Sequence, residues 1–119
     1  MATTALVVDD HPSFRRFACR LLEAGGFDVV GAVADGASVL PAVRKARPDV
    51  VLLDVLLPDE SGLEVAEQLA AEPNGPVVVL TSSRSAADFG DALARSSARG
   101  FIGKRDLTAS ALSALVGEP

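Results

Sequence analysis

The sequence lacks tryptophan and tyrosine and contains a single cysteine, Cys19. Its five phenylalanines are its only aromatic residues, so we predict no stacking platform for nucleic-acid bases or for a flavin. One cysteine cannot form an internal disulfide, and cytoplasmic residence is the default expectation. The longest apolar runs are far shorter than a membrane span, and residues 1–4 lack the basic segment of a signal peptide. We therefore expect no membrane contact.

Positive charge is also scarce, since 16 acidic residues outweigh 11 lysines and arginines to give a net charge of −5. A nucleic-acid-binding surface needs clustered basic residues, so we expect no nucleic acid to bind this chain. Apolar residues make up 49% of the 119 residues, enough for one packed core and little more. We predict a single domain over residues 1–119, with residues 117–119 as a frayed end or a cut linker.

Short apolar runs alternate with amphipathic segments along the chain. The runs cover residues 5–8, 29–33, 50–53, 77–80 and 100–103. Three of them are continuous apolar blocks rather than alternating patterns, which is typical of parallel strands covered on both faces. This alternation predicts a doubly wound α/β fold, with helices on both faces of one parallel sheet.

The segment from Pro12 to the glycine pair at residues 25–26 has the spacing of an amphipathic helix. Its apolar residues recur every three or four positions and form a stripe that should face the sheet. Members of the stripe are Phe14, Phe17, Ala18, Leu21 and Leu22. Phe14 and Phe17 are therefore predicted to lie in the core.

Four further segments are predicted to be helices. If Ser38 is the N-cap of the second helix, Pro41 falls in its first turn, and the third helix should start at Ser61. The fourth covers residues 86–94 and is the weakest, because Gly90 costs about 1 kcal/mol relative to alanine in a helix. The fifth covers residues 107–116.

Polar side chains follow four of the predicted strands. They are Asp9 and Asp10 after the first, Asp54 after the third, Thr81 and Ser82 after the fourth, and Lys104 after the fifth. Ligands of such sheets bind at the carboxyl ends of the strands, so these side chains should share one edge. Three neighbouring carboxylates repel one another unless a proton or a cation such as Mg²⁺ relieves them. Hydroxyl and ammonium groups suit phosphoryl oxygens, so the pattern predicts phosphoryl transfer to or from a carboxylate.

Each of these residues has a plainer explanation when it is taken alone. Asp9 and Asp10 could start a turn, Asp54 could end a strand, and Lys104 could be a solvated surface charge. Their coincidence at successive strand ends favours a shared site. His11, beside the acidic pair, is expected to serve locally at the start of the helix.

Four motifs occur in order along almost the whole chain. They are Val7-Val8-Asp9-Asp10-His11, Leu53-Asp54-Val55-Leu56-Leu57-Pro58-Asp59-Glu60-Ser61-Gly62, Leu80-Thr81-Ser82 and Gly100-Phe101-Ile102-Gly103-Lys104. Together they resemble the CheY-like receiver domain of two-component response regulators. The resemblance implies a flavodoxin-like fold, with a five-stranded parallel sheet in the order 2-1-3-4-5 flanked by five helices.

The resemblance also implies an acceptor and a metal site. Asp54 would accept a phosphoryl group from a sensor histidine kinase or a phosphotransfer protein. Asp10 would bind Mg²⁺ directly and Asp9 through water, with Asp54 and the backbone carbonyl of Leu56 as further ligands. On this account the chain is no enzyme beyond self-catalysed phosphoryl transfer and slow self-dephosphorylation.

Other residues would bind the phosphoryl group and carry the signal. Thr81, Ser82 and Lys104 would contact phosphoryl oxygens. Thr81 and Phe101 would form a switch that changes the surface of the fourth helix, fifth strand and fifth helix. That surface would act on a downstream protein partner or on an output domain outside these residues, and the family also permits homodimers.

The sequence departs from the family pattern at three positions. Arg105 follows Lys104, where many receivers have a cis-proline; the Lys-Arg-Asp-Leu pattern resembles the subclass often joined to a helix-turn-helix output domain. Phe101 replaces the commoner tyrosine. Leu56, two residues beyond Asp54, offers no polar group to orient a water, so we expect slow self-dephosphorylation.

Four other functions fit parts of the sequence. The chain could be the receiver fragment of a longer helix-turn-helix DNA-binding regulator, or a receiver-like interaction module that signals without phosphorylation. A phosphatase with an aspartyl-phosphate intermediate usually needs an acid where Leu56 stands. A flavin carrier of the same topology would need a Ser/Thr/Gly-rich phosphate loop and flanking aromatics, which the sequence lacks.

Overall fold

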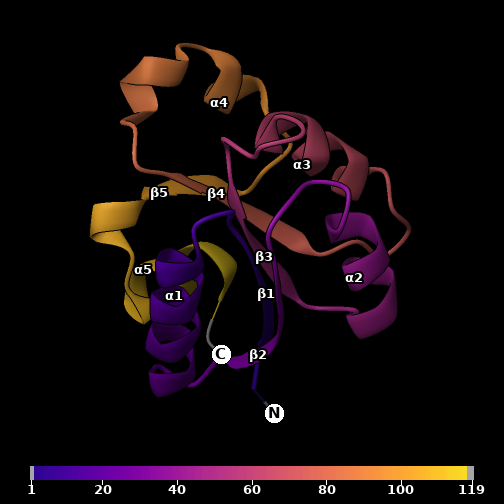
Figure 1. Ribbon diagram of the computed structural model, residues 1–119, viewed down its shortest axis with the longest axis vertical. Helices are drawn as coiled ribbons and strands as arrows, with labels where there is room; N and C mark the ends of the chain where they lie inside the picture. The colour runs from indigo at the N-terminus through magenta and orange to yellow at the C-terminus, as the bar shows by residue number, and fades with distance from the viewer. Residues whose placement is uncertain (1, 118–119) are drawn as a thin grey trace.

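Five strands form one parallel sheet in the order β2-β1-β3-β4-β5 in the computed structural model, which describes residues 2–117 (Figure 1). The strands are β1 (Thr4–Val8), β2 (Asp28–Val33), β3 (Val50–Asp54), β4 (Val77–Ser82) and β5 (Gly100–Gly103). The predicted doubly wound α/β fold and its strand order are thereby confirmed. Of the predicted frayed end, residues 118 and 119 lie outside the described part of the chain.

Helices and 3₁₀ turns lie between the strands and after the last one. They are α1 (Pro12–Ala24), α2 (Val39–Ala46), α3 (Gly62–Ala70), η1 (Ala86–Phe89), α4 (Ala92–Arg95), η2 (Lys104–Asp106) and α5 (Ala109–Val116). In Figure 1, α1 and α5 lie together on one side of the sheet, and α2 and α3 lie on the other. None of the helices within residues 2–117 is long and apolar enough to cross a membrane.

The three central strands are buried on both faces, as their continuous apolar sequences predict. Alternate residues of each strand point to opposite sides and enter two separate clusters. In β3, Val51 and Leu53 pack with α2 and α3, whereas Val50 and Leu52 pack with α1 and α5. This packing fixes the carboxyl ends of the strands, where the polar side chains follow.

Phe17 is an exception to the predicted core, because 51% of its surface is exposed. The fully buried residues of α1 are Ala18 and Leu22, so they define the face that meets the sheet. Phe17 precedes Ala18 by one residue and therefore points about 100° away around the helix. Phe14, one turn earlier, is half-buried beside the cluster.

The structure also corrects the fourth and fifth helices. Residues 86–94 do not form one helix, because Gly90 has φ 57° and ψ −133° and separates η1 from α4. The fifth helix starts at Ala109 rather than at residue 107. Thr108 is its N-cap and accepts the N–H of Ala111, while Leu107 is buried ahead of the helix.

Candidate functional site

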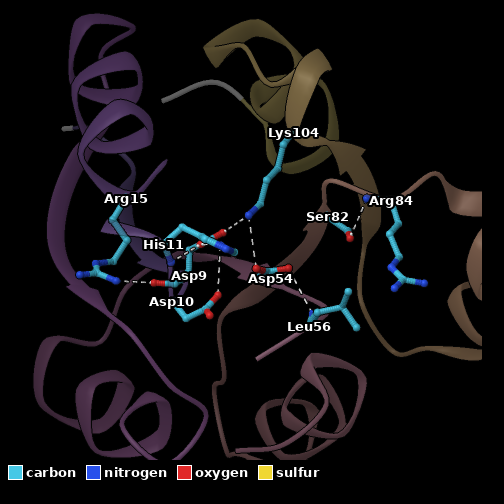
Figure 2. Close-up of polar contacts among 9 residues, drawn as sticks. All are labelled: Asp9, Asp10, His11, Arg15, Asp54, Leu56, Ser82, Arg84 and Lys104. Atoms are coloured by element: carbon cyan, nitrogen blue, oxygen red, sulfur yellow. Dashed lines mark hydrogen bonds and ion pairs between the residues drawn. The ribbon is translucent and has the colours of Figure 1, made fainter. Parts of the chain in front are cut away.

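The sheet register brings the ends of the central strands side by side. Asp54, the last residue of β3, is paired with Thr81 in β4. Val8, at the end of β1, is paired with Leu53, so Asp9 follows β1 next to Asp54. Lys104 directly follows β5 and extends back over the same edge (Figure 2). The strand-end residues predicted to gather at one edge therefore do so.

Three carboxylates and one imidazole form a compact cluster at this edge. Asp9, Asp10, His11 and Asp54 each offer a ligand atom, and these atoms lie within 4.8 Å of one another. Asp9 and Asp54 are buried, while Asp10 is partly exposed. His11 Nδ1 lies 3.2 Å from an oxygen of Asp9 and 3.2 Å from an oxygen of Asp10. His11 is the N-cap residue of α1, as its predicted local role requires, and it also contacts both carboxylates.

Three groups contact Asp9 and fix its position. The backbone N–H of His11 donates to its Oδ1 at 2.8 Å, and Lys104 Nζ lies 2.6 Å from its Oδ2. Arg15 Nη1 donates to its backbone carbonyl at 2.7 Å. Sequence reasoning missed Arg15. The available signal was a basic residue near the start of a helix, where the helix dipole favours acidic residues.

Asp54 is a buried carboxylate with few compensating donors. The N–H of Leu56 donates to its Oδ1 at 3.1 Å, and Lys104 Nζ lies 3.4 Å from its Oδ2. Burial, the N–H of Leu56 and the charges of Asp9 and Lys104 together raise the pKa of Asp54 to about 6. Burial is the largest influence and raises it, as does the charge of Asp9, whereas the N–H of Leu56 and the charge of Lys104 lower it. Asp54 is thus mainly ionised at neutral pH, and its negative charge is poorly solvated.

Lys104 bridges the two buried carboxylates. Its side chain is only 13% exposed, and its ammonium group lies between Asp9 and Asp54 (Figure 2). The same nitrogen lies 4.5 Å from the centre of the Phe14 ring. Phe14 was a core candidate in the sequence, and its contact with the cation was not foreseen.

The two hydroxyls at the end of β4 differ in their surroundings. Thr81 Oγ1 is buried and has no hydrogen-bond partner among the described residues. Ser82 Oγ accepts the N–H of Arg84 at 3.1 Å, so it is engaged by its own loop. Within the described residues, Ser82 makes no recorded contact with the carboxylates. Thr81 is therefore the freer hydroxyl for an incoming oxygen.

Phe101 lies behind the site on β5. Its partner in β4 is Leu80, the residue before Thr81. Its ring is half-buried and lies 6.3 Å from the ring of Phe89 in η1. A pocket of about 260 Å³ beside it is lined by Leu80, Ala86, Leu93, Ala94, Ala98, Gly100 and Phe101. The ring therefore has open space next to it.

Asp59 fastens two loops at the rim of the site. Its carboxylate accepts the N–H groups of Gly36 and Ala37 at 2.8 and 2.9 Å, which joins the β2–α2 loop to the β3–α3 loop. The N–H of Gly36, and then that of Ala37, lower the pKa of Asp59. Sequence reasoning missed this role, because the two segments are far apart in the chain and no local pattern links them.

Comparison with known proteins identifies a family and several relatives of this chain. Residues 5–116 match the response regulator receiver domain family. The chain is 41% identical over 88 residues to the DNA-binding response regulator MtrA of Mycolicibacterium smegmatis. The matched segment covers 74% of this chain and 38% of that protein. The chain is 36% identical over 83 residues to protein-glutamate methylesterase/protein-glutamine glutaminase 3 of Hahella chejuensis, covering 70% of this chain and 24% of that protein.

A solved structure extends the likeness to three dimensions. The CheY-like response regulator receiver domain of Methylobacillus flagellatus superposes with a TM-score of 0.83 at 27% identity, over 96% of this chain and 95% of that one. The chain thus spans nearly all of that solved domain but less than half the length of either curated relative.

Proposed function

Because this chain belongs to the response regulator receiver domain family, we propose that it is a switch controlled by phosphorylation of Asp54. The observation that carries the proposal is the environment of this carboxylate. Asp54 is 3% exposed, lies 3.4 Å from an ammonium group, and pairs in register with a threonine whose hydroxyl has no partner within residues 2–117. A buried carboxylate beside an ammonium group and a hydroxyl suits a nucleophile that receives an anionic group.

We propose Mg²⁺ as the cofactor of this site. The clustered oxygens of Asp9, Asp10 and Asp54 fit a hard cation, and the partly exposed Asp10 gives access from solvent. The backbone carbonyl of Leu56 would complete the protein ligands. When bound, the cation would offset the repulsion among the carboxylates and the negative charge of the phosphoryl group.

Several residues of the chain would have separate roles in phosphoryl transfer. An Asp54 carboxylate oxygen attacks phosphorus, the new oxygen–phosphorus bond forms, and the bond from phosphorus to the donor atom breaks as the donor leaves. The donor would be a phosphohistidine of a sensor histidine kinase or of a phosphotransfer protein. Lys104 would exchange a carboxylate oxygen for a phosphoryl oxygen, and Thr81 would donate its hydroxyl hydrogen to another. Ser82 could donate its hydroxyl hydrogen to a phosphoryl oxygen while its oxygen still accepts the N–H of Arg84.

Movement of Thr81 toward the phosphoryl group would carry the signal away from the site. It would leave space behind it, into which Phe101 turns from its contact with Phe89. The affected surface is formed by α4, β5 and α5. The break at Gly90 leaves α4 short, so we expect this segment to adjust readily.

The test is intact-mass measurement of the chain after incubation with Mg²⁺ and a small phosphodonor. We expect one phosphoryl adduct that is stable in acid and labile in base. The adduct should be absent from Asp54→Asn and absent when a chelator removes Mg²⁺. If Mg²⁺ binds but no adduct forms, the chain is better explained as an interaction module that signals without phosphorylation.

We further propose that residues 1–119 form one cytoplasmic receiver unit that acts on a protein partner. A second candidate is the receiver part of a DNA-binding regulator. It is favoured by the relative in M. smegmatis, which is a DNA-binding response regulator of which the match covers 38%. In that case the switch controls an output domain outside these residues. The length of the natural reading frame separates the two.

A further inference from the structure

We propose that Phe14 is a positioning residue for Lys104, holding its ammonium group between Asp9 and Asp54 by a cation–π contact; the link to phosphoryl transfer rests on the function proposed above. Lys104 Nζ lies 4.5 Å from the centre of the Phe14 ring, well within the range of such contacts. Phe14 is itself neither the proposed acceptor nor a proposed metal ligand. It acts only through the lysine.

The surroundings of the ammonium group explain why a ring is useful there. Lys104 Nζ has three N–H donors, and its ion pairs are with Asp9 at 2.6 Å and Asp54 at 3.4 Å. These carboxylates are the groups proposed to bind Mg²⁺ and the phosphoryl group. Their ion pairs with Lys104 must therefore change during the reaction. The Phe14 ring carries no charge and takes no part in either event, so its contact can persist throughout.

The position of Phe14 is itself fixed by the fold. Pro12 is the first residue of α1 and sets the start of the helix, which places Phe14 in its first turn. The ring packs at the edge of the core cluster beneath α1 and α5, and it contacts Phe17 with ring centres 6.1 Å apart. Lys104 reaches it from the end of β5. The contact therefore joins the first helix to the last strand across the site.

The cation–π attraction can be weakened without changing the shape of the ring. Fluorine atoms withdraw electron density from the ring face, so we would place 4-fluoro-, 3,5-difluoro- and 3,4,5-trifluorophenylalanine at position 14. The same series at position 17 is the control. Phe17 lies one turn along the helix, is exposed, and has no cation recorded over its ring within the described residues.

The first readout is the Lys104 side chain in the free protein, without Mg²⁺ or phosphodonor. We expect the ¹³Cε and ¹⁵Nζ chemical shifts of Lys104 to change stepwise with each fluorine at position 14 and to stay constant in the series at position 17. Constant shifts in both series would overturn the proposal. This readout needs no phosphorylation, so its result is independent of whether the proposed function is correct.

The second readout is the rate of phosphoryl-adduct formation with Mg²⁺ and a small phosphodonor. We expect the rate to fall stepwise with fluorination at position 14, by about three- to tenfold for the trifluoro ring. Phe14→Leu should be at least as slow, and Phe14→Tyr should stay close to the parent. Equal rates across the position 14 series would overturn the catalytic part of the proposal. No adduct in any variant, the parent included, would instead overturn the proposed function.

Discussion

Lys104 is closer to Asp9 than to Asp54, with Nζ 2.6 Å from Asp9 Oδ2 and 3.4 Å from Asp54 Oδ2. The ammonium group therefore neutralises the carboxylate that belongs to the predicted metal site and only partly compensates the predicted acceptor. Burial raises the pKa of Asp54 to about 6, and the more distant ammonium group only partly offsets this effect.

Asp54→Asn should stabilise the metal-free protein at pH 7.5 by about 2 kcal/mol. The folded pKa of about 6 lies above the usual value of 3.8, so the folded state binds more protons between those values. Wild-type stability therefore rises as the pH falls through 6, and the advantage of the variant should shrink toward pH 4. Urea unfolding with a chelator present measures this.

Asp28→Asn is the control for that experiment, because Asp28 is exposed at the start of β2. Its unfolding free energy should follow that of the wild type across the pH range. An Asp54→Asn variant that is less stable than wild type at pH 7.5 would contradict the account of a poorly solvated carboxylate.

Thr81→Val should leave the unphosphorylated protein as stable as wild type or more stable, by about 1 kcal/mol. The buried Thr81 hydroxyl has no partner among the described residues, and valine has nearly the same shape. Val79→Thr is the matched control, since it introduces a hydroxyl into a fully buried position of the same strand and should destabilise. Chemical unfolding compares the two, and a marked loss of stability in Thr81→Val would reveal a structural hydrogen bond.

Leu56→Asn should speed the loss of the phosphoryl group by about tenfold or more, because an amide can orient an attacking water. The Leu56 side chain is 47% exposed, so the new amide would face solvent at the rim of the site. The measurement is the decay of the adduct mass after removal of the phosphodonor. Leu56→Ala is the control, because it opens the site to water without supplying an amide to orient that water. An equal decay rate in wild type and Leu56→Asn would contradict the proposed role of the amide.

Asp59→Ala should speed hydrogen exchange at the amides of Gly36 and Ala37, because their acceptor is removed. The pKa of Asp59 is lowered, so this tether is fully present above its ordinary pKa and is lost as the pH falls through the lowered value. Exchange followed by NMR at pH 6 tests the prediction. Asp91→Ala, at an exposed carboxylate that makes no side-chain cap, should leave both amides unchanged.

The fold could be predicted because its signals are local and agree with one another. Continuous apolar sequence marks strands buried on two faces, and Pro12 and Ser61 mark helix starts that the structure reproduces. The strand-end residues could be grouped because parallel strands bring their carboxyl ends to one edge. The order of the strands came from the resemblance, since spacing alone does not fix which strands are neighbours.

The remaining features depend on contacts between distant segments. Phe17 is exposed because of the way α1 is rotated about its axis on the sheet. The apolar pattern of α1 does not fix this rotation, since neighbouring apolar residues such as Phe17 and Ala18 lie about 100° apart around the helix. The break at Gly90 requires a backbone conformation that glycine permits but does not impose. The contact of Phe14 with Lys104 and the tether of Asp59 each join residues that are far apart in the chain. No repeat or motif in the sequence records such pairs.

The most direct test of the central claim is to locate the phosphoryl group among the carboxylates of the site. Borohydride reduces an aspartyl phosphate to homoserine, and peptide sequencing by mass spectrometry then reports the residue. After treatment with Mg²⁺ and a small phosphodonor, we predict homoserine at position 54 and unchanged aspartate at positions 9 and 10. Homoserine at position 9 or 10, or at no position in a chain that has gained the adduct mass, would contradict the assignment of Asp54 as the acceptor.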